Sequence, residues 1–152
     1  MQSGLTKNKY KMVFSNKFED LSPEIISVLL PGISLGTIPI PTGMAMIFKP
    51  SGEITFNPLV ITFLVSKEMK NYRKIANWMF TMRDPENRKQ QDAYEQATIQ
   101  IYTPDGALLR LEVQFSQLFP IDITDILFES QLEDVPEIAT VTFSYDSYKF
   151  VE

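Results

Sequence analysis

Acidic side chains are the residues of this sequence whose types and spacing come closest to a catalytic pattern. Two carboxylate pairs lie close together along the chain, Asp122 with Asp125 and Glu133 with Asp134. Two facing carboxylates can act as general acid and base, as they do in glycoside hydrolysis. Both pairs belong to a stretch that is acidic throughout, and no feature of the sequence places them in an apolar cleft. They are therefore weak candidates for catalysis.

Histidine and cysteine are absent from the sequence. Histidine is the commonest general base near neutral pH and the commonest metal ligand, while cysteine is required for disulfides and thiolate metal sites. The sequence also lacks a Gly-rich phosphate loop and a nucleophile elbow. Residues 130–137 do not have the Asp/Asn/Gly spacing of a calcium loop. We therefore expect no enzymatic activity, no cofactor and no metal.

The overall composition is that of an ordinary globular protein. The chain has 152 residues and a formal net charge of -5, which argues against a free-standing nucleic-acid binder because phosphate recognition needs clustered basic residues. No apolar run approaches the roughly 20 residues that span a bilayer. Residues 1–10 are polar and basic and do not resemble a secretory signal. We expect a single domain over residues 1–152, made and used in the cytoplasm or in a particle assembled there.

The charges are unevenly distributed along the chain. Residues 67–89 carry seven basic and three acidic side chains, whereas residues 121–152 carry eight acidic side chains and Lys149 alone as a base. One interpretation is two solvated faces. The other is a subunit with complementary edges that steer its own assembly. In the second interpretation Arg73 and Lys74 of one subunit contact Glu133 and Asp134 of its neighbour.

Short alternating apolar segments predict a protein made mainly of β-strands. Two of these segments flank the tight turn at residues 103–106 and predict a hairpin. The segment 54–65 is apolar on both faces, so both faces should be covered, one by the core and the other by a helix or a partner. Turns are expected at residues 50–53 and in an acidic loop at 130–137. The predicted strands cover residues 9–15, 24–30, 54–65, 97–102, 107–115, a segment near 125–129, and 138–150.

A single helix is predicted after the strand 54–65. Ser66 is its expected N-cap and Glu68 suits the positive end of the helix dipole. Apolar side chains recur at spacings of three and four, which places Ile75 and Met79 in the core. Residues 82–96 are expected to be an exposed loop. The predicted apolar stripe consists of Met69, Tyr72, Ile75, Ala76 and Met79.

Residues 31–50 form an apolar segment interrupted by four prolines, with Lys49 as its one charge. Proline disfavours a central strand, and so many apolar residues disfavour a solvated loop. The segment is either an irregular edge hairpin packed on its own core or an extended arm that packs on a neighbouring subunit. We favour the arm, because an exposed apolar hairpin is an aggregation hazard in a monomer. Its candidate contact residues are Ile38, Ile40, Met44, Met46 and Phe48.

Together these elements predict a mainly β fold, an antiparallel β-barrel or β-sandwich with one flanking α-helix. Their order resembles the tail tube protein family of contractile-tailed bacteriophages. The resemblance starts with the strand near 8–14 and the turn Leu30-Pro31-Gly32. It continues with residues 52–62 leading into a helix that contains Trp78. It ends with residues 111–120, an Ile/Asp-rich crossover at 121–128, and a final strand around 140–148.

This resemblance implies a structural subunit of a tail tube or of a tube-initiating baseplate ring in the virion. Its rings would be six-fold and would stack, and their inner strands would join into one β-lined channel. Double-stranded DNA would pass through this channel without specific binding, and acidic residues, with Glu112 as a candidate, would face the DNA. Other tube, baseplate or sheath proteins would be its neighbours, with no role for a membrane. Residues 35–56 would form a protruding hairpin.

A second hypothesis belongs to a different class of function. A monomeric β-sandwich that binds carbohydrate or protein, such as a virion decoration domain, would also be rich in strands and poor in catalytic residues. It accounts less well for the apolar segment 31–50 and for the doubly apolar segment 54–65. The size of the purified protein distinguishes the two, because only the tube hypothesis requires rings or polymers.

Overall fold

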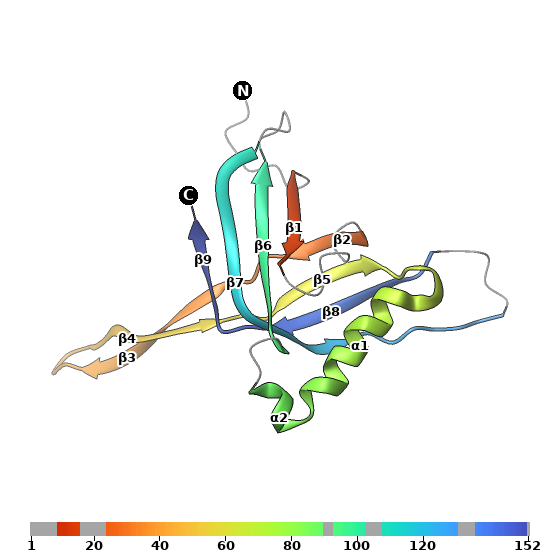
Figure 1. Cartoon of the computed structure of the whole chain (residues 1–152). Helices are drawn as coiled ribbons and strands as arrows, with labels where there is room; N and C mark the ends of the chain where they lie inside the picture. The colour runs from red at the N-terminus through yellow and green to blue at the C-terminus, as the bar shows by residue number, and fades with distance from the viewer. Residues whose placement is uncertain (1–8, 16–23, 90–92, 103–107, 131–135, 152) are drawn as a thin grey trace.

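The computed structural model describes residues 9–15, 24–89, 93–102, 108–130 and 136–151, and Figure 1 shows their arrangement. Antiparallel strands dominate, and one long helix lies along the side of the sheets, as the sequence predicts. The strands are β1 (Tyr10–Phe14), β2 (Ile25–Leu29), β3 (Ile33–Pro41), β4 (Met46–Phe56), β5 (Leu59–Leu64), β6 (Glu95–Tyr102), β7 (Leu108–Ile123), β8 (Ile138–Ser144) and β9 (Ser147–Val151). The helices are the 3-10 turn η2 (Lys67–Met69), α1 (Lys70–Met82) and α2 (Pro85–Arg88).

Strand β7 belongs to two sheets. Its first half pairs with β6 on one side and β9 on the other, and β1 extends this first sheet beyond β6. Its second half pairs with β8, which continues through β5 to β2 and forms the second sheet. In Figure 1 the strands of the first sheet run across those of the second at a steep angle. The two sheets therefore share one continuous strand at their corner.

The corner forms where β7 bends at Gln117. This residue has a left-handed φ of 56°, and the two residues of β7 between Phe115 and Leu118 face the one residue of β6 between Glu95 and Ala97. Such a bulge bends the strand and increases its twist. Residues 145–146 connect β8 to β9 at the same place, and the Asp146 amide donates to the Ser116 carbonyl at 2.9 Å. The bulge thus redirects β7 from the first sheet into the second.

The core lies between the two sheets, and α1 closes one side of it. Phe14 of the first sheet and Phe143 of the second approach with ring centroids 6.1 Å apart, and Trp78 of α1 lies 5.9 Å from Phe143. The indole Nε1 of Trp78 donates to the Ala93 carbonyl at 2.7 Å, which satisfies its only polar atom. The buried apolar residues of this core are Met12, Phe14, Leu59, Ile61, Phe63, Ile75, Trp78, Ala97, Ile99, Val113, Phe115, Leu118, Ala139, Val141 and Phe143.

The buried face of α1 is not quite the predicted one. Ile75 is fully buried as expected, but Met79 is only half-buried, so the prediction of Met79 as a core residue is wrong. The buried positions are Asn71, Ile75 and Trp78, which recur every four and three residues on one face. The sequence favours a different stripe because Asn71 is polar and does not look like a core residue.

Asn71 is buried because it ties the start of α1 to its surroundings. Its side chain accepts from the Ser66 amide at 3.0 Å and donates to the Leu64 carbonyl at 2.7 Å and to the Glu24 carboxylate. The Asn71 amide in turn donates to the Ser66 hydroxyl at 3.1 Å. Ser66 therefore serves the helix entry as predicted, although η2 separates it from α1 and Met69 is the N-cap of α1.

Two predicted long strands are each divided in the structure. The segment 54–65 breaks at Asn57 and Pro58, so β4 ends at Phe56 and β5 begins at Leu59. The segment 138–150 breaks at Tyr145 and Asp146 into β8 and β9. In the first case Asn57-Pro58 interrupts the strand pattern, and in the second the apolar positions change phase between Tyr145 and Tyr148. The two halves belong to different sheets.

Three further expectations are corrected. The predicted turn at residues 50–53 lies inside β4, and residues 124–129 form no strand because β7 extends to Ile123 instead.

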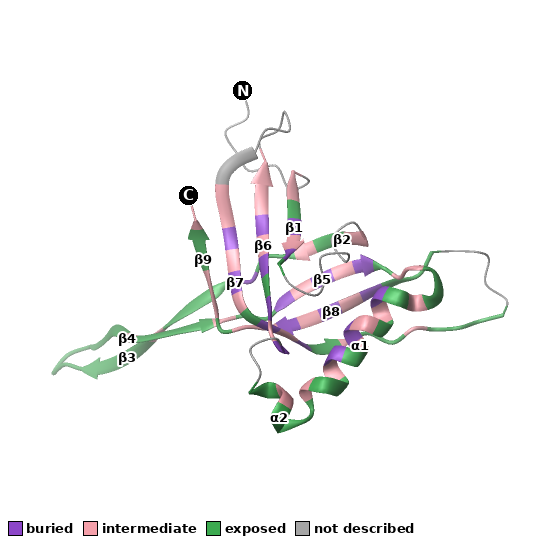
Figure 2. Cartoon of the chain, in the orientation of Figure 1, coloured by how far each residue is buried: buried purple, intermediate pink, exposed green. Residues whose placement is uncertain are grey.

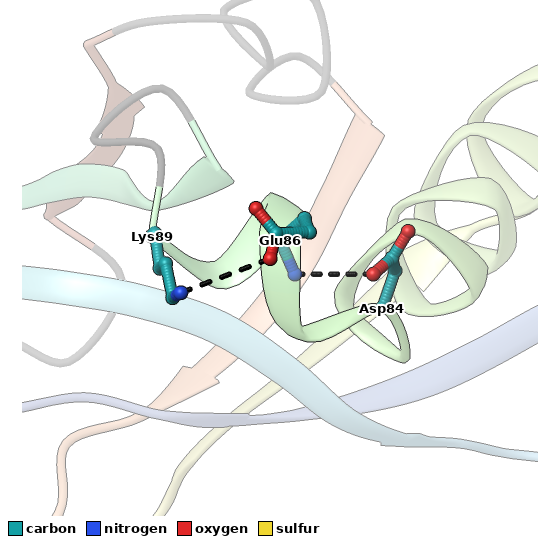
Figure 3. Close-up of polar contacts among 3 residues, drawn as sticks. All are labelled: Asp84, Glu86 and Lys89. Atoms are coloured by element: carbon teal, nitrogen blue, oxygen red, sulfur yellow. Dashed lines mark hydrogen bonds and ion pairs between the residues drawn. The ribbon is translucent and has the colours of Figure 1, made fainter.

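The expected loop 82–96 contains α2, which begins with Asp84 as N-cap and Pro85 in its first turn (Figure 3). The Asp84 carboxylate accepts from the Glu86 amide at 3.0 Å, and Glu86 pairs with Lys89 at 3.7 Å. Asp84 followed by Pro85 is a helix start signal. The predicted turn at 103–106 lies outside the described residues.

Candidate assembly surfaces

The first candidate surface is the hairpin β3–β4, hereafter the arm, which projects far beyond both sheets (Figure 1). Its turn at residues 42–45 is closed by a 2.8 Å bond from the Thr42 amide to the Ala45 carbonyl. The predicted contact residues are all exposed, with Met44 in the turn fully so. Figure 2 shows the arm as an almost continuous exposed ribbon. Among the described residues the arm has no sheet covering either face, and the protruding hairpin implied by the family resemblance is present.

The two faces of the arm differ in chemistry. Pairing places Pro39 opposite Phe48 and Pro41 opposite Met46 on one face, where Leu35 opposite Ile54 continues the apolar row. The other face carries Ile40 opposite Ile47 at the tip and Ile38 opposite Lys49, and becomes polar toward Ser34 opposite Thr55. The face with Phe48 also carries the pair Thr37–Pro50, is otherwise apolar in these pairs, and carries no charge in them. We call it the apolar face of the arm.

A bulge lies halfway along the arm. Between the pairs Leu35–Ile54 and Thr37–Pro50, β3 contributes Gly36 alone while β4 contributes three residues. Gly52 adopts a left-handed φ of 87° here, which favours glycine. A Cβ at Gly36 would meet the Ser51 hydroxyl, which would have to rotate away to make room for it. The residues that look like a turn in the sequence thus form a bulge that keeps the arm extended.

Two tyrosines, Tyr145 and Tyr148, fix the root of the arm, and we call them the root tyrosines. The Tyr145 hydroxyl donates to the Asn57 carbonyl at 2.7 Å, and the Tyr148 hydroxyl donates to the Pro31 carbonyl at 2.9 Å. Phe56 at the end of the arm packs against both rings, with centroids 5.8 and 5.3 Å away. Both strand ends of the arm are therefore attached to the corner of the two sheets. The sequence analysis did not identify this contact, and the only signal is the close spacing of the two tyrosines.

The environment of the root tyrosines predicts a pH effect on stability. Burial, with a smaller contribution from Tyr148, raises the pKa of Tyr145 from 10.0 to about 12. The folded protein keeps this proton in a pH range where the unfolded chain loses it. The stabilisation is therefore complete below pH 10 and is lost as the pH rises toward 12. In urea titrations, the Tyr145→Phe variant should lose less unfolding free energy over this range than wild type.

The comparison isolates Tyr145. Burial also raises the pKa of Tyr10, but Tyr10 is present in both proteins and its contribution cancels. Parallel pH profiles for wild type and Tyr145→Phe would show that the Tyr145 hydroxyl is as free in the folded protein as in the unfolded chain.

The second candidate surface is the open face of the first sheet, which points away from the core. Its side chains are mostly hydroxyls and amides, and a shallow groove of about 440 Å³ runs between them. Glu112 lies here, half-buried, opposite Gln100 on β6 and Val151 on β9. Lys11 and Lys149 lie on the same face as Glu112, so the described part of this face is not acidic overall. The described side chains of this face include Lys11, Val13, Ser15, Gln96, Thr98, Gln100, Glu112, Gln114, Ser116, Ser147, Lys149 and Val151.

The first sheet ends in two strands with unpaired outer edges, β1 and β9, within the part of the chain that the structure describes. The Tyr102 amide donates to the Lys9 carbonyl and the Ser15 amide to the Gln96 carbonyl, both at 2.9 Å. Hydrogen-bonded and non-hydrogen-bonded pairs alternate along two antiparallel strands. The backbone N–H and C=O groups of Tyr10, Met12 and Phe14 therefore point away from β6. The same alternation, carried across β6 and β7, directs the backbone groups of Tyr148 and Phe150 to the free edge of β9.

The third candidate surface is the basic side of α1. Arg73 is exposed, and Lys74 is half-buried beside it. Lys70, Arg73 and Asn77 form the outward row of the helix, which ends at Phe80, where the Arg83 guanidinium lies 5.6 Å from the ring centre. Glu133 and Asp134, the predicted partners of Arg73 and Lys74, lie outside the described residues. The electrostatic contact between neighbours therefore stays a prediction.

The described residues include no group of three or more side chains arranged to hold a metal ion. They also include no helix that is both long and apolar enough to cross a membrane.

Comparison with known proteins identifies the family. A family model described as phage tail tube protein matches residues 3–151. The tail tube terminator protein of Enterobacteria phage T4 is 22% identical over 153 residues, covering 95% of this chain and 87% of that protein. The fold is shared with a sheath/tube terminator of an extracellular contractile injection system, at a TM-score of 0.72 and 16% identity over 100% of this chain and 99% of the other. It is also shared with the tube-terminating cap of the anti-feeding prophage, at a TM-score of 0.73 and 14% identity over 99% and 92% of the two chains.

These relatives are structural tail proteins rather than enzymes, and they support a place in the virion tail. The match spans almost the whole chain, and the fold agrees with it from the first strand to the last. The chain belongs to the phage tail tube protein family.

Proposed function

We propose that this protein forms a closed ring that terminates the tail tube of a contractile-tailed phage. The observation that carries the proposal is the pair of edges on the first sheet, at β1 and β9, that no other described strand pairs with. Edge strands with free N–H and C=O groups pair readily with another chain. If β9 of one subunit pairs with β1 of the next, the first sheets join around a ring and both edges of the first sheet are satisfied. A monomeric decoration domain would leave both edges unpaired.

The ring proposal also gives the open face of the first sheet a role. In a closed ring this face lines the central channel, with Glu112 and its hydroxyl and amide neighbours directed inward. Such side chains offer few charges that hold DNA phosphates, since specific retention needs clustered Lys and Arg. Double-stranded DNA would therefore slide through without specific binding. Six copies per ring is the number that the family resemblance implies.

The position at the end of the tube rests on the relatives named as terminators or caps. The neighbours of the ring would then be the last ring of the tail tube on one side and sheath or head-proximal proteins around it. Assembly would take place in the host cytoplasm. A baseplate ring that initiates the tube is the alternative place in the tail, favoured by the shared fold with a baseplate component of the anti-feeding prophage at a TM-score of 0.65.

One substitution tests the edge pairing directly. Phe150 is exposed, and its amide points to the free edge of β9 rather than to β7. The Phe150→Pro variant removes this donor without removing a β7–β9 hydrogen bond, and proline is tolerated on edge strands. We expect wild-type protein to form rings in negative-stain micrographs, with a mass of about six subunits by light scattering, and the variant to remain monomeric.

The matched control is Phe150→Ala, which loses the same side chain but keeps the amide. It should still form rings if the backbone edge is what matters. Circular dichroism should show the same strand content for all three proteins. Rings formed by Phe150→Pro as readily as by wild type would contradict pairing through β9.

A further inference from the structure

The second sheet carries an exposed apolar surface at the end remote from the arm. Leu64 and Ile138 are cross-strand partners there and are 39% and 52% exposed. Ile26, 52% exposed, lies in the bulge at the start of β2. We call Ile26, Leu64 and Ile138 the end patch.

The end patch is the uncovered side of the strand that the sequence predicts to be covered on both faces. One face of β5 is buried in the core through Leu59, Ile61 and Phe63. The other face carries Leu64, and neither α1 nor any other described segment buries that side chain. Monomers rarely expose several large apolar side chains together without a partner.

The arm is a fitting partner for the end patch. Its apolar face carries Phe48, Met46 and Leu35, each more than half exposed, and it has no charge that burial would penalise. The end patch is also uncharged. The two surfaces differ from each other, so a contact between copies of this chain that uses them is heterologous, and such a contact propagates from copy to copy until it closes a ring.

The directions of the two surfaces agree with the proposed ring. In Figure 1 the arm extends past β9, whereas the far ends of β2, β5 and β8 extend past β1. A neighbour that places its β1 beside β9 therefore also brings its own end patch to the side on which the arm projects. One neighbour could satisfy both the free edge of β9 and the arm.

We propose that the apolar face of the arm packs on the end patch of the adjacent subunit in the same ring. The inference rests on the proposed ring and adds the surface that receives the arm. The root tyrosines support it, because they hold the arm in the direction of that neighbour before the neighbour arrives. The arm then connects adjacent subunits of one ring and does not contact the next ring.

Two single variants, used separately and mixed, test the contact. Phe48→Glu places a charge on the apolar face of the arm, and Ile138→Lys places one on the end patch; both side chains are exposed, so folding should be unaffected. Each variant alone should lose rings. The mixture should form heterodimers of twice the subunit mass and nothing larger, because the intact arm of Ile138→Lys can bind the intact patch of Phe48→Glu once only.

The matched control is Ile47→Glu, which places the same charge on the opposite face of the arm and should keep its rings. If Phe48→Glu still forms rings but no longer binds the end of a tail tube, the arm contacts the next ring; the inference is then wrong and the ring proposal stands. Mixtures that contain only monomers would also overturn the inference. If wild-type protein itself is monomeric, the ring proposal fails and this inference fails with it.

Discussion

The Ile75→Asp variant is expected to be unfolded at room temperature. Ile75 has no exposed surface, and it lies on the face of α1 that closes the core beside Trp78. The substitution removes a buried apolar side chain and leaves an unpaired carboxylate in its place. Together these effects should cost at least about 4 kcal/mol, a large part of the roughly 5–15 kcal/mol by which domains are stable. Near-ultraviolet circular dichroism and thermal unfolding would measure the loss.

The matched control is Met79→Asp on the same helix. The sequence pattern gives both positions equal weight, but the structure leaves Met79 half-buried, so its carboxylate can reach water. This variant should remain folded with a modest decrease in melting temperature. Equal destabilisation by the two substitutions would show that α1 docks through a broader face than the structure indicates.

Deletion of residues 37–48 should produce a folded protein that does not assemble. The cut lies beyond the bulge, and Ile38 pairs with Lys49, so two glycines can join Gly36 to Lys49. The root contacts of Tyr145, Tyr148 and Phe56 remain in place. The melting temperature should therefore stay close to that of wild type, while light scattering should show monomers at concentrations where wild type is fully assembled.

The control for this deletion is a variant that removes only the turn, residues 42–45, and closes the hairpin with two glycines. It keeps Met46 and Phe48 on the apolar face and should retain assembly. If the longer deletion still forms rings, the arm is not an assembly element. If it unfolds, the arm contributes to the core through contacts that its exposure does not suggest.

Local patterns in the sequence are sufficient to predict most of the strands and the helix. Alternation in β1, β6 and β8 places Met12, Ile99 and Val141 in the core, as found. The segment 31–50 is predicted to be an extended arm because apolar residues and prolines coincide there, and the structure confirms the extended hairpin. Such features depend on residues close together in the chain, which is where sequence patterns are informative.

The connections between sheets are not predictable in the same way. The break at Asn57 and the bend at Gln117 each change the sheet to which the following residues belong, and local sequence patterns do not specify which sheet that is. The bend depends on a left-handed residue that is not glycine, which no local rule predicts. The root tyrosines depend on contacts across 88 and 117 residues of sequence. These features arise from the tertiary fold and not from local preference.

The fixed root of the arm has a consequence for the timing of assembly. An arm that ordered only on binding would add its conformational entropy to the cost of each association. Here that ordering is completed when the chain folds. In the proposed ring, association would therefore be limited by how often correctly oriented subunits meet, and its rate would follow subunit concentration. The same fixed arm keeps its apolar side chains in water until a neighbour arrives. If the protein assembles as proposed, a newly made subunit would be most prone to aggregate while its partners are scarce, and rapid synthesis of many copies in one place would protect it.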